Sequence, residues 1–171
     1  KASSKHLHLS PSMSKMVIMN HIKEGMDLAK KYRLKPAIID FILQHHGTSL
    51  VYYFYRKALE EGEGLEAIHE EGFRYPGPRP ASKETAIVLL ADSVEAACRV
   101  LTDPQPAKIE EVVHKVINNK FIDGQLDDCE LTLKDLENIA KVFIHILSGF
   151  YHGRIEYPET SRKENHHKKQ D

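Results

Sequence analysis

Apolar residues recur at helical spacing along most of the chain. In the first clear segment, Met13, Met16, Val17, Met19 and Ile22 follow roughly the spacing of one helix face. Further segments repeat this pattern, and none alternates convincingly between apolar and polar residues as a half-buried strand would. We therefore predict an all-α fold, a helical bundle with helices approximately at residues 11–34, 36–47, 51–61, 83–101, 107–119 and 133–151.

Residues that cap helices stand where several of these segments begin. Ser10 precedes a proline at the first helix, and Ser82 stands directly before the strongest helical pattern. Thr132 opens the last helix, and Thr48 or Ser49 can cap the third. Each hydroxyl can accept a hydrogen bond from a free N–H of the first turn, so the sequence indicates where these helices start.

The last helix and the stretch before the fourth helix have distinct patterns. Residues 62–80 are rich in glycine and proline, which predicts a long ordered loop of a kind that is often functional. In the last helix the predicted apolar face consists of Ile139, Val142, Phe143, Ile146 and Leu147. The tail at residues 159–171 is polar, and we predict that it is disordered.

Composition narrows the class of protein. The 171 residues suffice for one domain with a core, and 24 Lys and Arg against 25 Asp and Glu give a net charge of -1. This balance gives no support to a surface for duplex nucleic acid or to a polybasic membrane anchor. No apolar run has the length of a membrane span, and the chain starts at Lys1, so we expect a soluble fragment of a longer protein.

The two cysteines do not indicate a disulfide framework or a thiolate zinc site, because neither Cys98 nor Cys129 belongs to a CxxC pair. Cys98 lies in an apolar helical pattern and is predicted to be a small core residue. This usage fits a reducing, cytoplasmic setting.

Histidine is the residue type that points to chemistry. Of 11 histidines, His21 lies in the first helix, and His45 and His46 are adjacent at the end of the second. Adjacent residues within a helix point about 100° apart, but Gly47 could end the helix and let the pair converge with His21. Imidazoles are the commonest metal ligands, and Asp92, in an apolar helix, needs a partner or a metal.

Simpler interpretations remain open for each of these residues. The histidine pair could serve only the helix end, and Asp92 could be an internal cap or an ion-pair partner. Isolated histidines such as His69 and His114 are typical surface residues. The spacing alone therefore favours a metal site only moderately, and the tail histidines suggest no more than adventitious binding.

Several motifs in order resemble the HD-domain hydrolases of the seven-transmembrane HD receptor group. They are Ser-Met-Ser-Lys at 12–15 leading to Asn20-His21, then Ile-Ile-Asp-Phe-Ile-Leu-Gln-His-His-Gly-Thr at 38–48, Phe-Arg-Tyr-Pro-Gly-Pro-Arg-Pro at 73–80 followed by Ser-Lys-Glu at 82–84, and Leu-Ala-Asp-Ser-Val-Glu-Ala-Ala at 90–97. The resemblance implies an HD-domain bundle over residues 10–158, after a truncated lead-in at residues 1–9.

The resemblance also implies an activity. Members of that group are membrane proteins whose cytoplasmic HD domain hydrolyses cyclic di-AMP to pApA, so we expect the domain at the cytoplasmic face of the cell membrane. It implies two divalent metal ions, with iron or manganese favoured. His21, His45 and His46 match the ligands of one ion, and Asp92 matches the closing ligand of the other. Whether the protein forms a homodimer is left open.

One departure from the family pattern is plain. The family has an adjacent His-Asp pair whose aspartate bridges the two metals, and this sequence contains none, since His6 and His8 are not followed by Asp. We expect that the pair lies before Ser10 in the longer protein and that this fragment alone is a poor enzyme.

Candidate substrate contacts and alternative functions complete the prediction. Thr48, Arg79, Lys83 and Tyr53, the last with its neighbours Tyr52 and Tyr55, could meet phosphates or stack on adenine, and Glu95 could support a ligand histidine. Cyclic di-GMP is the second choice of substrate. The related group that hydrolyses it carries a Gly-Tyr-Pro signature, and this sequence has none. Hydrolysis of other nucleotides, or a non-catalytic nucleotide-sensing module, also remains open.

Overall fold

The computed structural model describes residues 10–62 and 68–152, and these are almost entirely helical. Within these ranges the β-type pairing is confined to an isolated bridge between Leu50 and Arg74. The predicted all-α class is confirmed. The elements are α1 (Pro11–Lys31), α2 (Pro36–Gln44), α3 (Tyr52–Glu61), the 3-10 helix η1 (Glu70–Phe73), α4 (Lys83–Arg99), α5 (Pro106–Ile122) and α6 (Leu133–His152).

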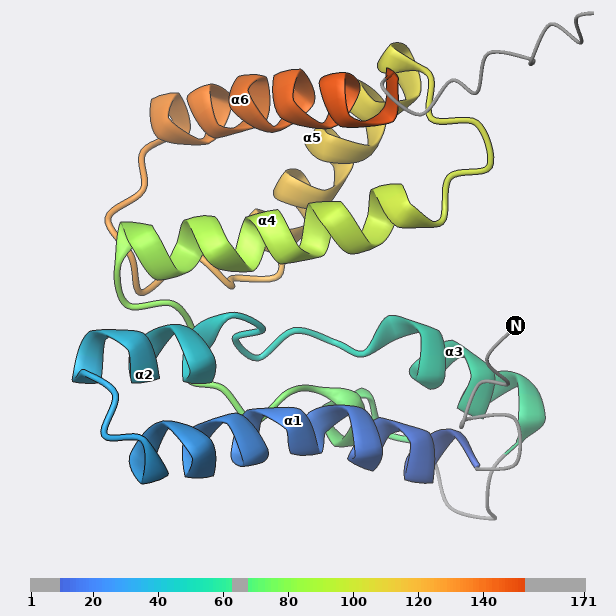
Figure 1. The fold of residues 1–171 in the computed structure, drawn as a ribbon. Coiled ribbons are helices and arrows are strands. Elements are labelled where there is room, and N and C mark those ends of the chain that lie inside the picture. The colour runs from blue at the N-terminus through green and yellow to red at the C-terminus, as the bar shows by residue number, and fades with distance from the viewer. Residues whose placement is uncertain (1–9, 63–67, 153–171) are drawn as a thin grey trace, which may run out of the picture.

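The helices form two layers that meet along α2 and α4. Helices α1, α2 and α3 make one layer, and α4, α5 and α6 make the other (Figure 1). Within the layers α1 contacts both α2 and α3, and α5 contacts both α4 and α6. Among the described residues, no helix is both long and apolar enough to cross a membrane. The functional residues predicted from the sequence lie on both layers, so their meeting depends on how the layers join.

The main core belongs to the second layer. It is built on side chains of α4 and α5 that are at most 1% exposed, including Leu89, Leu90, Val94, Ile109 and Val113. Cys98 lies in this core with no exposed surface, as predicted. A smaller cluster around Phe54, Ala58 and Phe73 joins α3 to η1. Because burial of apolar surface dominates folding stability, α4 is the best-fixed element on which to place a functional side chain.

The caps are confirmed for three of the four helices. Ser10 accepts a hydrogen bond from Met13 N–H, Ser82 accepts one from Thr85 N–H, and Thr132 accepts one from Asp135 N–H. The prediction for α3 is wrong: Val51 holds the N-cap position and makes no side-chain cap bond. The reason is that the hydroxyls of the two residues expected to cap it are engaged with the second layer instead.

The predicted apolar face of α6 packs only in part. Ile139, Phe143 and Leu147 lie against the main core, whereas Val142 is 54% exposed and Ile146 is 58% exposed. The predicted apolar face is therefore wider than the part of it that packs on the main core within the described chain. The lead-in at residues 1–9 and the tail at residues 159–171 lie outside the described residues.

Candidate metal centre

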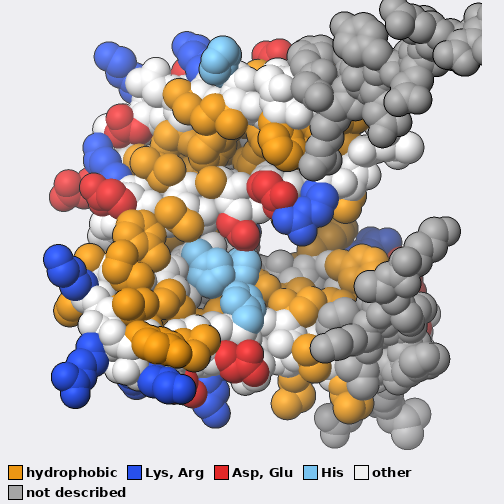
Figure 2. All heavy atoms as spheres, viewed as in Figure 1, with side chains coloured by type: hydrophobic (Ala, Val, Ile, Leu, Met, Phe, Trp, Pro, Cys, Tyr) orange, Lys and Arg blue, Asp and Glu red, His pale blue; other side chains and the backbone are white. Residues whose placement is uncertain are grey.

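The ends of two helices bring three histidines together. Helix α2 ends at Gln44, His45 occupies its C-cap position, and Gly47 takes a left-handed conformation with φ +55°. This turn leaves His45 and His46 facing His21 on α1. One ligand nitrogen from each ring lies within 4.8 Å of the other two. Figure 2 shows histidine side chains gathered in the middle of one face of the molecule. The expected convergence is confirmed, while the role as metal ligands stays a prediction.

Hydrogen bonds orient the three rings. The Nδ1–H groups of His21 and His45 can donate to the carbonyl oxygens of Ile18 and Ile42, one turn earlier in their own chain segments. Nδ1 of His46 lies 3.3 Å from a carboxylate oxygen of Asp92 on α4. A proton held on Nδ1 leaves the lone pair on Nε2. The hydrogen bond at Nδ1 thus fixes the tautomer whose Nε2 can bind a metal.

The geometry at the centre fits a cation. The Nε2 atoms of His21 and His45 are 3.1 Å apart. Two nitrogens that bind the same ion, each at about 2.0–2.1 Å, can lie this close to each other. With both protons on Nδ1, the two lone pairs face each other and repel, and a shared cation relieves this repulsion. The donor set therefore suits a metal such as zinc, iron or nickel, for which imidazole is a good ligand.

Burial keeps the central ring neutral. Burial, with smaller contributions from the neighbouring His45, His21 and Lys120, lowers the pKa of His46 from 6.5 to about 3. A neutral imidazole retains the lone pair that a metal needs. Burial also raises the pKa of Asp92, against the opposing effect of His45. Asp92 thus lies beside the histidines, as expected, and contacts His46 directly.

Tyr75 supports the centre, and sequence reasoning did not single it out. Its ring stacks on His46 with centroids 4.3 Å apart and an interplanar angle of 17°. Burial raises the pKa of Tyr75 to about 12, so the phenol remains neutral beside Asp92. The residue belongs to the resemblance motif at 73–80, which was the available signal for its importance.

A clamp from the second layer holds the turn after the histidine pair. Gln125, which is 1% exposed, accepts a hydrogen bond from Thr48 N–H at 2.9 Å and donates one to the Thr48 hydroxyl at 3.0 Å. Arg74 donates to the Thr48 carbonyl at 3.0 Å. Gly47 fits against this clamp, since a Cβ there would lie 2.4 Å from Gln125 Oε1. The Thr48 hydroxyl, predicted to meet substrate, is therefore used for structure.

The other predicted substrate contacts lie away from the histidines' cavity. Arg79 donates to the Gly124 carbonyl and pairs with two aspartates of the α5–α6 connection. Lys83 pairs with Asp135 at 3.0 Å, and Tyr53 is 69% exposed. Neither these three nor Thr48 lines the cavity beside His46. The structure thus gives these four contacts no geometric support.

Glu95 also differs from its expected place. Its carboxylate accepts two hydrogen bonds from one Arg99 nitrogen, at 2.6 and 2.7 Å, on the same helix. It is therefore an exposed ion-pair partner in this structure and supports none of the three histidines. The helical spacing from Asp92 predicted a shared face correctly but could not reveal the competing arginine one turn later.

A cavity of about 700 Å³ opens beside His46 and Asp92. Its wall combines apolar and aromatic residues, including Val51, Tyr52 and Tyr75, with charged residues such as Arg74 and Lys120. This volume lies within the range of about 300–1,000 Å³ that is typical of ligand sites. The cavity joins the two layers, because its lining comes from both sides of the α2–α4 contact.

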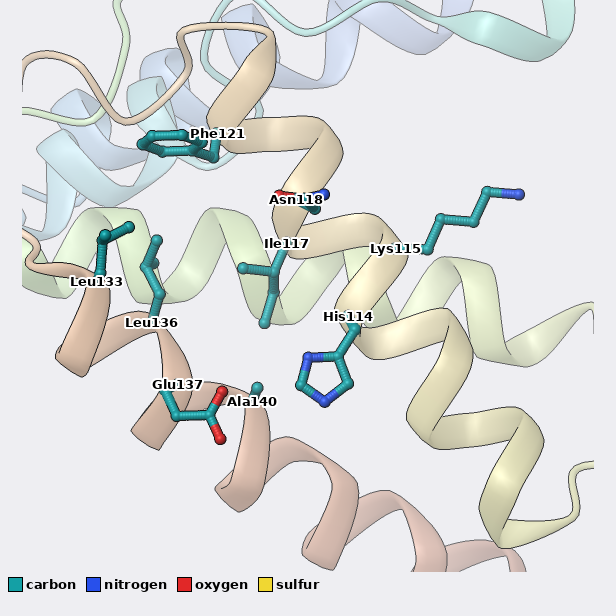
Figure 3. Close-up of a pocket in the computed structure, with 9 residues that line it drawn as sticks. All are labelled: His114, Lys115, Ile117, Asn118, Phe121, Leu133, Leu136, Glu137 and Ala140. Atoms are coloured by element: carbon teal, nitrogen blue, oxygen red, sulfur yellow. The ribbon is translucent and has the colours of Figure 1, made fainter.

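A second groove lies between α5 and α6 (Figure 3). It measures about 420 Å³, and it shares no lining residue with the cavity beside His46. The ring of His114 points into the groove, whereas Lys115 points away from it (Figure 3). His114 therefore lies apart from the histidine centre, in agreement with its interpretation as an ordinary surface residue.

Comparisons with known proteins identify the domain. No family model matches the chain. The chain is 40% identical to the crystallised HD domain of Listeria monocytogenes phosphodiesterase PgpH, with a TM-score of 0.81. The match covers 89% of this chain and 70% of that chain. The chain belongs to the PgpH HD-domain family. The PgpH HD domain has also been solved in complex with cyclic-di-AMP, and that structure matches with a TM-score of 0.82 and 40% identity, over 88% of this chain and 69% of that chain.

A curated relative places the domain within a longer protein. The chain is 48% identical over 158 residues to the cyclic-di-AMP phosphodiesterase PgpH of Bacillus subtilis, which corresponds to 92% of this chain. It spans 22% of that relative's length. The all-α fold and the resemblance to HD-domain hydrolases are thus confirmed.

Proposed function

We propose that the protein containing this chain is a metal-dependent phosphodiesterase that hydrolyses cyclic di-AMP to pApA. The observation that carries the proposal is the convergence of His21, His45 and His46 beside Asp92, at the wall of a cavity large enough for a nucleotide. The match to the PgpH HD domain, which has been solved with cyclic-di-AMP, supports the choice of substrate. Within this proposal residues 10–158 form the HD domain.

The metal centre would use side chains from both layers. His21, His45 and His46 would hold one divalent ion, and Asp92 would contribute to a second, with iron or manganese favoured. When bound, two such ions supply charge stabilisation at the phosphate and an activated water. The expectation that the domain lies at the cytoplasmic face of the cell membrane, within a membrane protein, belongs to this same proposal.

The chain's own residues would prepare the site in three ways. The Ile18 and Ile42 carbonyls and the Asp92 carboxylate hold protons on Nδ1, which keeps each Nε2 available. Tyr75 fixes the plane of His46 by stacking. The apolar wall near Val51 and Tyr52 offers a surface for a nucleoside.

The test is an assay of the full-length protein with manganese or ferrous iron, in which pApA release from cyclic di-AMP is followed by chromatography. We expect turnover that depends on metal, and its loss in His45→Ala together with loss of bound metal measured by mass spectrometry. The control is His114→Ala, whose histidine lies in the separate α5–α6 groove. Preference for cyclic di-GMP or another nucleotide would refute the substrate, and metal-independent turnover would refute the centre.

A further inference from the structure

Lys120 lies near the C-terminal end of α5 and lines the same cavity as His46 and Asp92. Its Nζ donates a hydrogen bond to the Ser49 hydroxyl at 2.6 Å. Ser49 is only 3% exposed and follows the histidine pair by three residues, so it holds the ammonium at a defined point of the cavity wall. The lysine is thus a fixed cation in the cavity.

Among the described residues, Lys120 differs from the neighbouring Arg74 in having no carboxylate as an ion-pair partner. Arg74, the other cation of the wall, lies 2.6 Å from Glu70 and 2.8 Å from Asp123. Within residues 10–62 and 68–152, no carboxylate lies within the 4.0 Å ion-pair distance of Lys120 Nζ. Burial lowers the pKa of this lysine, while Asp123 and Asp92 act in the opposite direction from farther away. A partly buried charge without an ion-pair partner is costly, and an anion that pairs with it recovers that cost.

Lys120 and the Asp92–His46 pair line the same cavity without an ion pair between them. Asp92 contacts His46 at 3.3 Å, but Asp92 and Lys120 are not within ion-pair distance of each other. Because the hydrogen bond to Ser49 fixes the ammonium of Lys120 on the wall, the cavity offers an anion a second cationic position besides the histidine centre. The cavity volume of about 700 Å³ and its apolar lining, which includes Tyr52, Val116 and Ile122, have room for a nucleoside.

We propose that Lys120 binds the phosphate of a cyclic dinucleotide that is not being cleaved, while the scissile phosphate lies at the histidine centre. This inference rests on the proposed function. Lys120 would select substrates that carry two phosphates separated by a nucleoside, because only these reach both positions. Its contribution would appear in substrate binding, since the second phosphate changes little in charge during cleavage of the first.

The experiment compares Lys120→Met with wild type in the full-length, metal-loaded protein on two substrates. Cyclic di-AMP carries two phosphates, and bis(p-nitrophenyl) phosphate carries only the one that is cleaved. For cyclic di-AMP we expect KM to rise roughly tenfold to a hundredfold with little change in kcat, as for loss of one charge-assisted hydrogen bond. For bis(p-nitrophenyl) phosphate we expect kcat/KM to stay within about twofold. Calorimetric binding of a non-hydrolysable phosphorothioate analogue of cyclic di-AMP should weaken by the same factor.

Two further variants separate charge from structure. Ser49→Ala removes the hydrogen bond to Lys120 but keeps the ammonium, so it should have a much smaller effect on KM. Lys120→Arg keeps the charge and should restore part of the affinity. Equal loss on both substrates, or a Ser49→Ala variant that reproduces Lys120→Met, would overturn the inference in favour of a structural lysine. Wild-type protein that cleaves bis(p-nitrophenyl) phosphate but not cyclic di-AMP would instead overturn the proposed function, and the inference with it.

Discussion

Gly47 is the residue on which the position of the histidine pair most directly depends. Its φ of +55° is a conformation that L side chains rarely adopt, and an added Cβ would lie 2.4 Å from Gln125 Oε1. We expect Gly47→Ala to lower the free energy of unfolding by about 1–3 kcal/mol, from backbone strain and overpacking together. Urea unfolding followed by circular dichroism measures this change.

The matched control for that variant is Gly72→Ala. Gly72 has no neighbouring atom within 4 Å of an added Cβ, and its φ is not in the left-handed range. Its free energy of unfolding should stay within about 0.5 kcal/mol of wild type. Equal destabilisation by the two substitutions would show that the turn at Gly47 has no special constraint.

Individual residues were predictable where their chemistry is visible locally. His45, His46 and Gly47 stand together in the sequence, so a helix end with two converging rings could be inferred from them alone. Gln125 and Lys120 could not be found in this way, because they meet Thr48 and Ser49 only through contacts that span 77 and 71 residues. The same long-range contacts explain why Thr48 does not line the cavity beside His46.

At the scale of elements, the start of α6 is set by a reciprocal pair of hydrogen bonds. Asp135 accepts from Thr132 N–H at 3.0 Å, and Thr132 accepts from Asp135 N–H at 3.1 Å. The backbone N–H of Thr132, with Lys83 from the start of α4, lowers the pKa of Asp135 from 3.8 to about 2. The ionised carboxylate therefore joins α6 to α4 as well as capping its own helix.

This cap predicts a pH dependence of stability. A carboxyl group whose folded pKa is lowered stabilises the fold fully above its unfolded pKa of about 3.8, and the effect is lost as pH falls toward 2. Asp135→Asn should therefore lower Tm at pH 7, and the difference from wild type should shrink below pH 3.8. Thermal melts at several pH values measure it. Glu130→Gln, at an exposed carboxylate, is the control and should give no such convergence.

Helix types and most boundaries followed from the sequence, because period and caps are local properties. Helix α3 was the exception at its start, where Val51 stands at the cap position without a side-chain bond. There the backbone is fixed by the bridge between Leu50 and Arg74, and by Val51 N–H donating to the Phe73 carbonyl. A cap preference could not anticipate this, since the stabilising partners come from the loop that follows α3.

At the scale of the whole molecule, the proposed centre joins the two layers. His21, His45 and His46 belong to the first layer, and Asp92 belongs to α4 in the second. A ligand that binds only the folded state stabilises it by about 2.7 kcal/mol at one hundred times its Kd. Added manganese or ferrous iron should thus raise Tm by roughly 5–10 °C for a domain of this size.

Removal of metal by a chelator should reverse this rise in Tm. His21→Ala should abolish the response to metal, whereas His114→Ala should retain it, because His114 lies in the α5–α6 groove. A rise of equal size in the His21 variant would place the stabilising metal elsewhere on the chain. Differential scanning calorimetry with and without chelator measures all three proteins.

The hydrogen bonds between Thr48 and Gln125 also impose an order on how the protein can be made. After Thr48 the ribosome must add 77 residues to reach Gln125, at roughly 5–20 per second, so the turn waits roughly 4–15 s for its partner. During that interval the chain gains α4 with Asp92, but the hydrogen bonds between Gln125 and Thr48 cannot yet form. A chain released after α4 would carry every candidate ligand named above without the Gln125 hydrogen bonds that hold the turn after the histidine pair. The turn beside the proposed centre is therefore held by its full set of hydrogen bonds only once the chain has been made as far as Gln125.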